Sequence, residues 1–305
     1  MKINVSSEIG HLNGVIVHTP GHEVSLVNPE LKDELLFDDI IFEEDAREEH
    51  LDMLDLFKAA MPKDGQVIEI VDLFKDSIQN EEARAFFIEQ LIREFPEENL
   101  SVIEKQLHKL DAQQLQEFST QGVLPGGSKF SLLPSPNLLF TRDLAAVVDD
   151  TILISRAATK TRLRESLMME TLVEFNPLFD SVRDSAIRIS GNQSIEGGDV
   201  LVESKDLVLI GMSERTSFTG LMKAADGLLN HGVKTVLAVD IPKQRSSMHL
   251  DTIFTFASNS ECIALPPAIM EQQDNVVALQ KVNGAIQAES RSSLQSALNE
   301  FSANT

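Results

Sequence analysis

The pattern of apolar and polar positions along this 305-residue chain predicts strands and helices in the opening section and helices alone in a later segment. In the opening section a short apolar strand at 14–18 precedes apolar residues at helical spacing over 42–61. From about 74 to 122 the strand signal stops and Glu, Gln, Lys and Leu dominate, which predicts helices. We therefore expect a core made of residues 1–73 and 123–305, with an all-helical insertion at 74–122.

The section after Pro136 repeats one layout three times. An apolar strand, a polar turn and a second apolar strand begin at Asp143, Asp199 and Asp251, and these aspartates lie 56 and then 52 residues apart. An amphipathic helix and a further strand follow each of the first two hairpins. A ββαβ unit of this period is typical of radial repetition about an axis. The pattern predicts an α/β propeller whose acidic motifs converge near that axis.

The charge balance narrows the classes of partner. The chain carries 48 acidic and 26 basic residues, for a net charge of −22, which would repel phosphate backbones and anionic membranes. Neither a signal-peptide pattern nor a run of ~20 apolar residues occurs. We expect a cytoplasmic protein that takes a small-molecule substrate and binds no nucleic acid and no membrane. A single cysteine, Cys262, excludes an internal disulfide and a multi-cysteine metal site.

Three motifs before the hairpins hold the residue types that recognition of a cation requires. They are Phe140-Thr-Arg-Asp143, Glu196-Gly-Gly-Asp199 and His249-Leu-Asp251. Each motif alone is weak, because an aspartate before a strand is commonly a turn or cap residue and a His-x-Asp pair is commonly structural. Their placement at the same point of successive repeats favours one shared site.

Taken together, the motifs resemble those of arginine deiminases, which are guanidine-modifying enzymes. The matching segments are Asn137–Asp143, Glu196–Asp199, Gly211–Thr216 and His249–Thr252. The resemblance runs from about residue 5 to 257 and implies a five-bladed, pseudo-symmetric ββαβ propeller of the pentein type, with its last blade incomplete. It also implies hydrolysis of L-arginine to L-citrulline and ammonia through a cysteine-linked amidino intermediate, with no cofactor and no metal. A homodimer is left open.

The resemblance assigns roles to the acidic motifs. Asp143 and Asp251 would hold the guanidinium nitrogens in forked, charge-assisted hydrogen bonds, with Glu196 beside them. His249 would protonate the departing ammonia and then activate the hydrolytic water, because a histidine titrates near neutral pH.

Three further residues match positions that hold the α-carboxylate of the substrate, namely Asn137, Arg162 and Arg215. Arg164 could take the place of Arg162 as the residue that binds the carboxylate. Alternatively, Arg162 is only a surface arginine of a helix.

The nucleophile is where the resemblance stops. The family attacks the guanidinium carbon with a cysteine thiolate from a Gly- and Arg-rich loop, and this sequence has no such segment. Cys262 lies eleven residues after Asp251, as Ile154 and Ile210 lie eleven residues after their own aspartates. This count predicts that Cys262 is buried and inert. The chain is therefore expected to be an inactive or truncated member of the family.

Three alternatives stay open. An amidinotransferase would share the acidic site and pass the amidino group to an amine, although the Phe-Thr-Arg-Asp and His-Leu-Asp-Thr segments favour a deiminase. A non-catalytic protein would bind arginine without turnover. A metal-dependent hydrolase would use His249, Asp251, Asp143 and Glu196 as nitrogen and oxygen ligands.

Overall fold

The computed structural model of the chain describes residues 2–302, which divide into two compact units. The first unit combines Met1–Gly10, Arg142–Ala158 and Asp180–Thr305, and the second combines His11–Thr141 and Thr159–Phe179. Each unit is described by itself below. Among the described helices, none is both long and apolar enough to cross a membrane.

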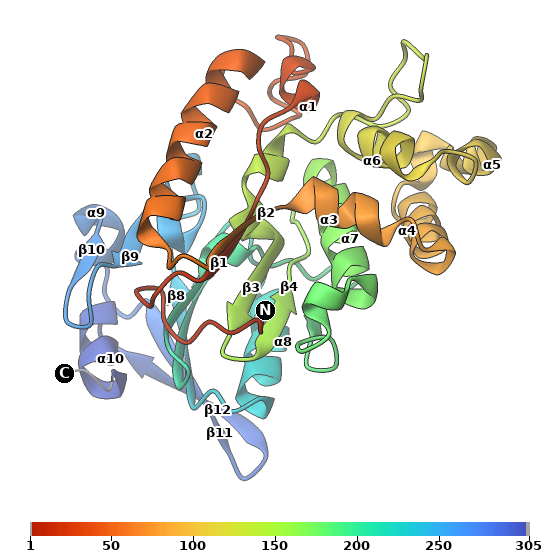
Figure 1. Cartoon of the computed structure of the whole chain (residues 1–305). Coiled ribbons are helices and arrows are strands. Elements are labelled where there is room, and N and C mark those ends of the chain that lie inside the picture. Colours follow the sequence, from red (N-terminus) through yellow and green to blue (C-terminus); the bar gives the residue numbers. More distant parts are fainter. Residues whose placement is uncertain (1, 303–305) are drawn as a thin grey trace. The chain divides into compact units, whose positions relative to one another are not determined.

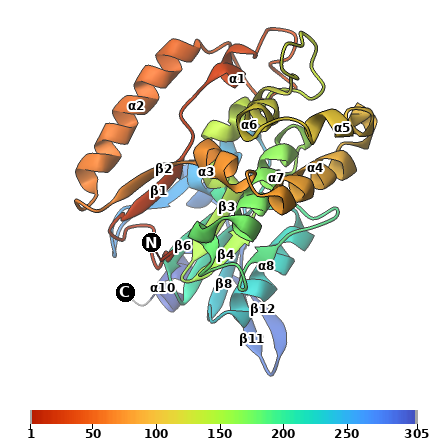
Figure 2. The same cartoon turned by 45° about the vertical axis from the view of Figure 1, so that its right-hand side comes forward.

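The first unit holds ten strands in three sheets and three helices (Figures 1 and 2). Its strands are β3 (Ala145–Val148), β4 (Thr151–Ile154), β5 (Ile187–Arg188), β6 (Val200–Ser204), β7 (Leu207–Met212), β8 (Thr235–Asp240), β9 (Phe254–Phe256), β10 (Cys262–Ala264), β11 (Val276–Val282) and β12 (Ala285–Arg291). Its helices are α8 (Phe218–Asn230), α9 (Pro266–Ile269) and α10 (Leu294–Phe301). The sheets have the orders β3-β4-β5, β12-β11-β8-β7-β6 and β10-β9.

The hairpins of the first two predicted repeats and the strand that returns to each form as the sequence pattern indicates, whereas the helix of the first repeat, Lys160–Phe175, belongs to the second unit. β3 and β4 are an antiparallel hairpin, and β5 then pairs with β4 in parallel. β6 and β7 are the second hairpin, and β8 pairs in parallel with β7. Helix α8 packs on the strands of this second repeat, where its apolar side chains share a core with Val208 and Ile210 of β7 and Val236 of β8. An apolar hairpin, a helix and a returning strand thus bury one continuous core.

The third repeat departs from this plan. β9 and β10 form the expected hairpin, but the next long strand, β11, pairs antiparallel with β8 and with β12. The β11–β12 hairpin was not predicted, although its turn, Asn283-Gly284, has positive φ at both residues and is a strong hairpin signal. The structure is α/β, and closure into five blades stays a prediction.

The second unit holds one small sheet and seven helices. Strands β1 (Gly14–Val17) and β2 (Gln66–Glu69) pair in parallel. The helices are α1 (His22–Ser25), α2 (Glu43–Ala60), α3 (Ile70–Ser77), α4 (Glu81–Glu94), α5 (Glu104–Leu107), α6 (Ala112–Gln121) and α7 (Lys160–Phe175). Three-residue and four-residue 3-10 turns link several of these elements.

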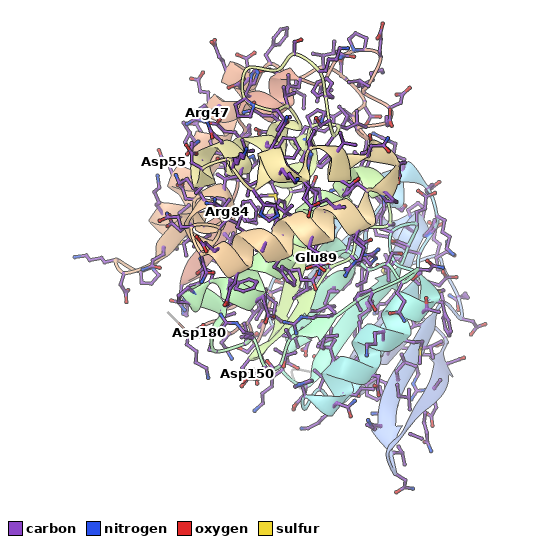
Figure 3. All side chains as sticks on the ribbon, turned by 90° about the vertical axis from the view of Figure 1, so that its right-hand side faces the viewer. Arg47, Asp55, Arg84, Glu89, Asp150 and Asp180 are labelled. Atoms are coloured by element: carbon purple, nitrogen blue, oxygen red, sulfur yellow. The ribbon has the colours of Figure 1, made fainter. Side chains whose placement is uncertain are left out.

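Helices α3, α4, α6 and α7 enclose an apolar core. In it the rings of Phe74 and Phe87 make an edge-to-face contact, with 4.8 Å between their centroids. Arg84 lies on α4 and is marked together with Glu89 in Figure 3. It donates to the carbonyls of Ile78 and Leu110, and these hydrogen bonds connect α4 to the segments that follow α3 and precede α6. Residues 74–122, all of them described, contain helices and turns and no strand. That this segment is an insertion dispensable for the site stays a prediction.

Candidate active site

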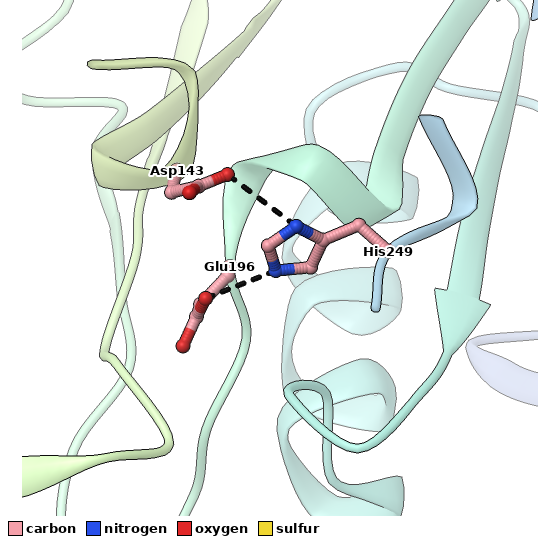
Figure 4. A group of neighbouring side chains, drawn as sticks. All are labelled: Asp143, Glu196 and His249. Carbon is pink, nitrogen blue, oxygen red and sulfur yellow. Dashed lines mark hydrogen bonds and ion pairs between the residues drawn. The ribbon is translucent and has the colours of Figure 1, made fainter. Parts of the chain in front are cut away.

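A buried cluster of three side chains lies in the first unit, and we call Asp143, Glu196 and His249 the histidine cluster (Figure 4). His249 Nε2 donates to Glu196 Oε2 at 2.9 Å, and Nδ1 lies 3.6 Å from Asp143 Oδ1. The side chains of Glu196 and His249 are almost fully buried and that of Asp143 is 11% exposed. Both ring nitrogens of the imidazole therefore face carboxylates.

The repeats explain how residues 106 positions apart come together. Asp143 lies in the turn just before β3, Glu196 precedes the turn Gly197–Asp199 before β6, and His249 precedes the turn Leu250–Thr252 before β9. Gly198 permits this approach, because a Cβ atom there would lie 2.7 Å from His249 Nδ1 and 3.0 Å from Asp143 Oδ1. Equivalent positions of three hairpins thus supply one cluster.

The electrostatics favour a charged imidazole. Burial by itself lowers the pKa of His249, but the hydrogen bond with Glu196 and the charges of Asp143 and Asp199 outweigh it and raise that pKa above its ordinary value. A protonated ring donates from both nitrogens, which matches the two carboxylates that face it. The cluster can hold a proton on His249 and release it to a group placed nearby.

Glu196 is held by a second contact. Its Oε1 accepts a hydrogen bond from the backbone N–H of Ala158 at 3.0 Å. Arg215 Nη1 lies 4.0 Å from the same oxygen, is buried, and donates to no acceptor among the described residues. The other terminal nitrogen of Arg215 donates to Met248 Sδ at 3.6 Å. Arg215 therefore presents a buried cation with free donors, which suits an anionic group of a ligand.

Asp251 is close enough to the cluster to interact with it electrostatically. Burial raises its pKa, as does the charge of Asp143, whereas His249 and Arg142 lower it. Its carboxylate accepts no hydrogen bond from the residues that the structure describes. A half-buried carboxylate without a hydrogen-bond donor is a candidate for binding a cation from outside the chain.

Arg142 and Asp199 also stabilise this region. Both lie in the sequence motifs, but neither was among the predicted site residues. Arg142 forms a fork with Glu8, with nitrogen–oxygen distances of 3.0 and 3.2 Å, and donates to the carbonyl of Gly197. The short run Glu8-Ile-Gly and the arginine of Phe-Thr-Arg-Asp were both visible in the sequence, but nothing there paired them.

Asp199 is the second of these residues and is fully buried. It accepts hydrogen bonds from Ser213 Oγ at 2.5 Å, Thr216 Oγ1 at 2.6 Å and the backbone N–H of Leu250 at 2.9 Å. Burial raises its pKa to about 6, although these donors and His249 act in the opposite direction. Asp199 ties the segment that carries His249 to the loop that carries Arg215.

The other predicted residues belong to the second unit. Asn137 Nδ2 donates to the carbonyl of Leu35 at 2.8 Å. Arg162, which is buried, donates from Nε to Glu165 Oε2 at 2.9 Å and from Nη2 to the carbonyl of Asn137 at 3.2 Å. Its reading as a surface arginine is therefore wrong, because the amino-terminal turns of α7 face the interior of the second unit.

Arg164, the rival of Arg162, is also buried and is engaged by its own unit. It donates from Nε to Ser135 Oγ at 3.0 Å and from Nη2 to the carbonyl of Leu133 at 2.5 Å. Burial lowers its pKa to about 10. These contacts give Arg164 a structural role in holding the loop before residue 136.

The prediction that Cys262 is buried is wrong, because its side chain is exposed. The count of eleven residues failed since the third hairpin has a different register. Ala145 and Val200 pair with Ile154 and Ile210 and lie two and one residues after their aspartates, whereas Cys262 pairs with Phe256, five residues after Asp251. Partial burial still raises the pKa of the Cys262 thiol, which is the opposite of activation.

Cys262 lines a cavity of about 550 Å³ in the first unit, and none of the three cluster residues lines that cavity. The chemistry of the histidine cluster and the only thiol of the chain are thus in different places.

A metal ion is a further possible occupant of the histidine cluster, since one ligand atom from each residue lies within 4.8 Å of the others. A metal needs a neutral imidazole with a free lone pair. The raised pKa of His249 and the carboxylates at both of its nitrogens favour the protonated ring instead. The donor set therefore fits a resident metal poorly.

Comparison with known proteins agrees with the motifs. The family model for arginine deiminase matches residues 33–302. The arginine deiminase of Listeria monocytogenes is 32% identical over 98% of this chain and 77% of its own length. That of Streptococcus uberis is 34% identical over 83% of this chain and 67% of its own length.

A solved structure shows the same fold at low identity. It is the product-bound N-terminal domain of ArgZ, an arginine dihydrolase of the ornithine–ammonia cycle in cyanobacteria, with a TM-score of 0.51 and 15% identity over 84% of this chain and 67% of that one. The likeness concerns the α/β fold alone. The sequence matches go further: this chain belongs to the arginine deiminase family, whose members hydrolyse a carbon–nitrogen bond of an amidine group.

Proposed function

We propose that the first unit binds the guanidinium group of L-arginine, or of a related guanidino compound, beside the histidine cluster. The observation that carries the proposal is the contact of Asp143 and Glu196 with both ring nitrogens of His249, with Asp251 in electrostatic range of the ring. A buried nitrogen of Arg215 lies 4.0 Å from Glu196 and has no hydrogen-bond acceptor among the described residues. The cationic end of arginine would meet the carboxylates and its α-carboxylate would meet Arg215.

The carboxylates supply most of the recognition. Each close contact between a carboxylate and a guanidinium is worth about 4 kcal/mol at an effective dielectric of 20, before desolvation is subtracted. Asp251 gains most from such a ligand, because its carboxylate has no hydrogen-bond donor within the described chain. Asp143 would exchange part of its contact with His249 for a fork with the substrate.

His249 would act as the general acid and base of the reaction. In its neutral form it would accept a proton from the water that attacks the guanidinium carbon, so that a carbon–oxygen bond forms. The protonated ring would then donate that proton to one amino group, so that ammonia leaves as its carbon–nitrogen bond breaks. The hydroxyl left on the carbon returns a proton to the ring and becomes the urea oxygen of citrulline. Glu196 would hold the ring through Nε2 and stabilise its positive charge.

The position of Cys262 limits the rate. A covalent mechanism needs a thiolate against the guanidinium carbon, and Cys262 lies instead in the 550 Å³ cavity with a raised pKa. Water would then attack a resonance-stabilised cation directly. Loss of the nucleophile in a covalent mechanism typically costs several orders of magnitude in rate. We therefore propose that this 305-residue chain binds arginine and converts it to citrulline slowly at most.

Calorimetry with L-arginine, together with a citrulline assay, tests both halves of the proposal. We expect saturable binding that Asp143→Ala abolishes and that Asp240→Ala, an exposed aspartate at the end of β8, leaves unchanged. Agmatine, which lacks the carboxylate, should bind more weakly because Arg215 loses its partner. Absence of arginine binding to the folded protein would refute the proposed site.

The enzymatic half has its own decisive outcome. Steady citrulline production that persists in Cys262→Ser would show that the chain turns over without a thiol and that the rate argument is wrong. Transfer of the amidino group to an added amine such as glycine would instead indicate the amidinotransferase alternative. The cytoplasmic location and the small-molecule substrate remain part of this proposal.

A further inference from the structure

Glu8 and Arg142 form a pair beside the histidine cluster, although they lie 134 positions apart in the chain. The two carboxylate oxygens of Glu8 accept from the two terminal nitrogens of Arg142, at 3.0 and 3.2 Å. Such a two-point contact fixes the plane and the direction of the guanidinium as well as its position. Arg142 directly precedes Asp143 in the chain, so whatever holds Arg142 also limits where Asp143 lies.

The segment that carries Glu8 is itself bound to the edge of a sheet. β6 is the last strand of the five-stranded sheet, so its outer edge has backbone groups that do not bond to β7. At Val202 of β6 the backbone N–H donates to Glu8 Oε1 and the carbonyl accepts from the N–H of Glu8, both at 2.9 Å. Glu8 is therefore held through its backbone and its side chain, which makes it a fixed anchor for Arg142.

Arg142 uses its other hydrogen bonds on the segment that follows Glu196. Nε donates to the carbonyl of Gly197 at 3.0 Å, and Nη2 donates to the carbonyl of Val200. The backbones of the two turns also lie against each other, because a Cβ atom on Gly197 would be only 2.1 Å from the carbonyl oxygen of Arg142. One guanidinium thus connects the turn that carries Asp143 to the turn that Glu196 precedes.

These two turns place carboxylates on both sides of His249. Asp143 Oδ1 lies 3.6 Å from Nδ1 of the ring, and Glu196 Oε2 lies 2.9 Å from Nε2. Burial lowers the pKa of His249, whereas the hydrogen bond with Glu196 and the charge of Asp143 raise it. A shift of about 1 Å between the turns would therefore change the proton affinity of the ring and move a carboxylate away from a ligand.

The charges of the pair also reach Asp251, but they oppose each other there. Besides burial, which raises the pKa of Asp251, Arg142 lowers that pKa and Glu8 raises it. Because a paired arginine and glutamate carry no net charge together, the pair leaves the acidic character of the site nearly unchanged. The contacts of the pair therefore favour a role in position over a role in charge.

We propose that Glu8 and Arg142 are positioning residues of the candidate active site, which hold Asp143 and Glu196 in place on either side of His249. Both act through these neighbours and not on a substrate directly. The part of this inference that concerns arginine rests on the proposed function, whereas the part that concerns His249 does not. A pair that acts by charge alone, or that only stabilises the fold, is the alternative.

Substitutions of Arg142 separate position from charge. Arg142→Lys keeps the positive charge but cannot form the fork, whereas Arg142→Gln removes the charge. If the pair acts by position, both variants should lower the pKa of His249 and weaken the binding of L-arginine on the order of tenfold. If it acted by charge alone, Arg142→Lys would match the wild type and Arg142→Gln would bind the cation more tightly.

Substitution of Glu8 completes a double-mutant cycle. Glu8→Gln keeps the size of the side chain and an oxygen that can accept from the N–H of Val202, so the segment stays on β6. It should cause the same losses as Arg142→Lys. The variant with both changes should lose no more than either single variant, since each change breaks the same fork. Additive losses would show that the two residues act independently and would overturn the proposal.

Two measurements follow the two halves of the inference. NMR titration of the seven histidines, with His249→Gln to identify the signal, gives the pKa of His249 in the absence of arginine. Calorimetry gives the affinity for L-arginine. Arg291→Lys is the matched control, because Arg291 forms a similar fork with Glu300 at 2.6 and 2.7 Å that joins β12 to α10, and it should change neither quantity.

An unchanged pKa of His249 in folded Arg142→Lys and Glu8→Gln would overturn the inference. Urea denaturation of the same variants completes this outcome, because a loss of stability without a change of that pKa would show a merely structural pair. If the wild type binds no arginine but the pKa of His249 falls in both variants, the proposed function fails and the positioning role stands. Glu8→Gln keeps the test decisive even if the Arg142 variants fail to fold.

Discussion

The second and third repeats begin with the same sequence pattern and reach opposite states. In the second repeat Asp199 is fully buried with three hydrogen-bond donors, and its hairpin is covered by α8 and completed by β8. In the third repeat Asp251 accepts no hydrogen bond from the described residues, and among these residues its second strand, β10, pairs only with β9. The same type of residue at the same point of a repeat is thus a structural support in one and a candidate for ligand binding in the other.

The comparison teaches that an aspartate at the start of a repeat can either support the fold or remain available to a ligand. A fully buried carboxylate with three donors from its own chain, such as Asp199, has little left to offer a substrate. A carboxylate that burial and neighbouring charges leave unsatisfied gains free energy when a cation arrives. Four measurements would break or sharpen this contrast.

The largest expected difference concerns thiol reactivity at two positions that each lie eleven residues after the aspartate of their repeat. Ile210 of β7 is fully buried, whereas Cys262 of β10 is exposed. In a Cys262→Ser background, Ile210→Cys should react with a disulfide reagent more than about a thousandfold more slowly than native Cys262, because labelling then requires opening of a core strand. Comparable rates would show that the two hairpins are equally open.

Removal of the two aspartates should affect stability very unequally. Asp199→Ala strands three donors in the interior and should lower the free energy of unfolding by about 4 kcal/mol. Asp251→Ala removes no hydrogen bond and should change it by less than about 1 kcal/mol. Urea denaturation at pH 7 measures both. An equal loss in the two variants would contradict the division between support and binding residue.

The pH dependence of stability should reveal the buried charge of Asp199. Its pKa is about 6 in the folded chain against 3.8 ordinarily, so its contribution to stability is complete below pH 4 and is lost as the pH rises through 6. Asp199→Asn does not titrate. Between pH 4 and pH 8 the wild type should therefore lose about 3 kcal/mol of unfolding free energy relative to the variant.

Asp240→Asn, at an exposed aspartate, is the control for this pH series and should show no such shift. A difference between Asp199→Asn and wild type that stays constant with pH would mean that the three donors keep Asp199 ionised throughout.

The smallest expected effect is on ligand binding. Asp251→Asn keeps the shape of the side chain and removes its charge, so it should weaken L-arginine about thirtyfold, equivalent to about 2 kcal/mol. Calorimetry at low ionic strength measures this, again with Asp240→Asn as the control. Unchanged affinity would show that Asp251 does not contact the guanidinium.

The local pattern was enough to predict much of the molecule. Pairs of apolar runs separated by a polar turn identified the hairpins that start after Asp143, Asp199 and Asp251, since such runs are a local property of the sequence. The helix of 218–230 and the absence of strands in 74–122 followed for the same reason. The motifs also indicated the arginine deiminase family, because their residue types and order are visible without coordinates.

The sequence alone determined which residues could do chemistry, and the tertiary structure decided which of them are free to do it. The register of β9 and β10 moved Cys262 to the surface, and the donors of Asp199 come from residues 14, 17 and 51 positions away. Strand register and long-range hydrogen bonds depend on which segments meet in space. Because no local pattern encodes that meeting, two aspartates that look alike in the sequence acquire different surroundings only when the chain is folded.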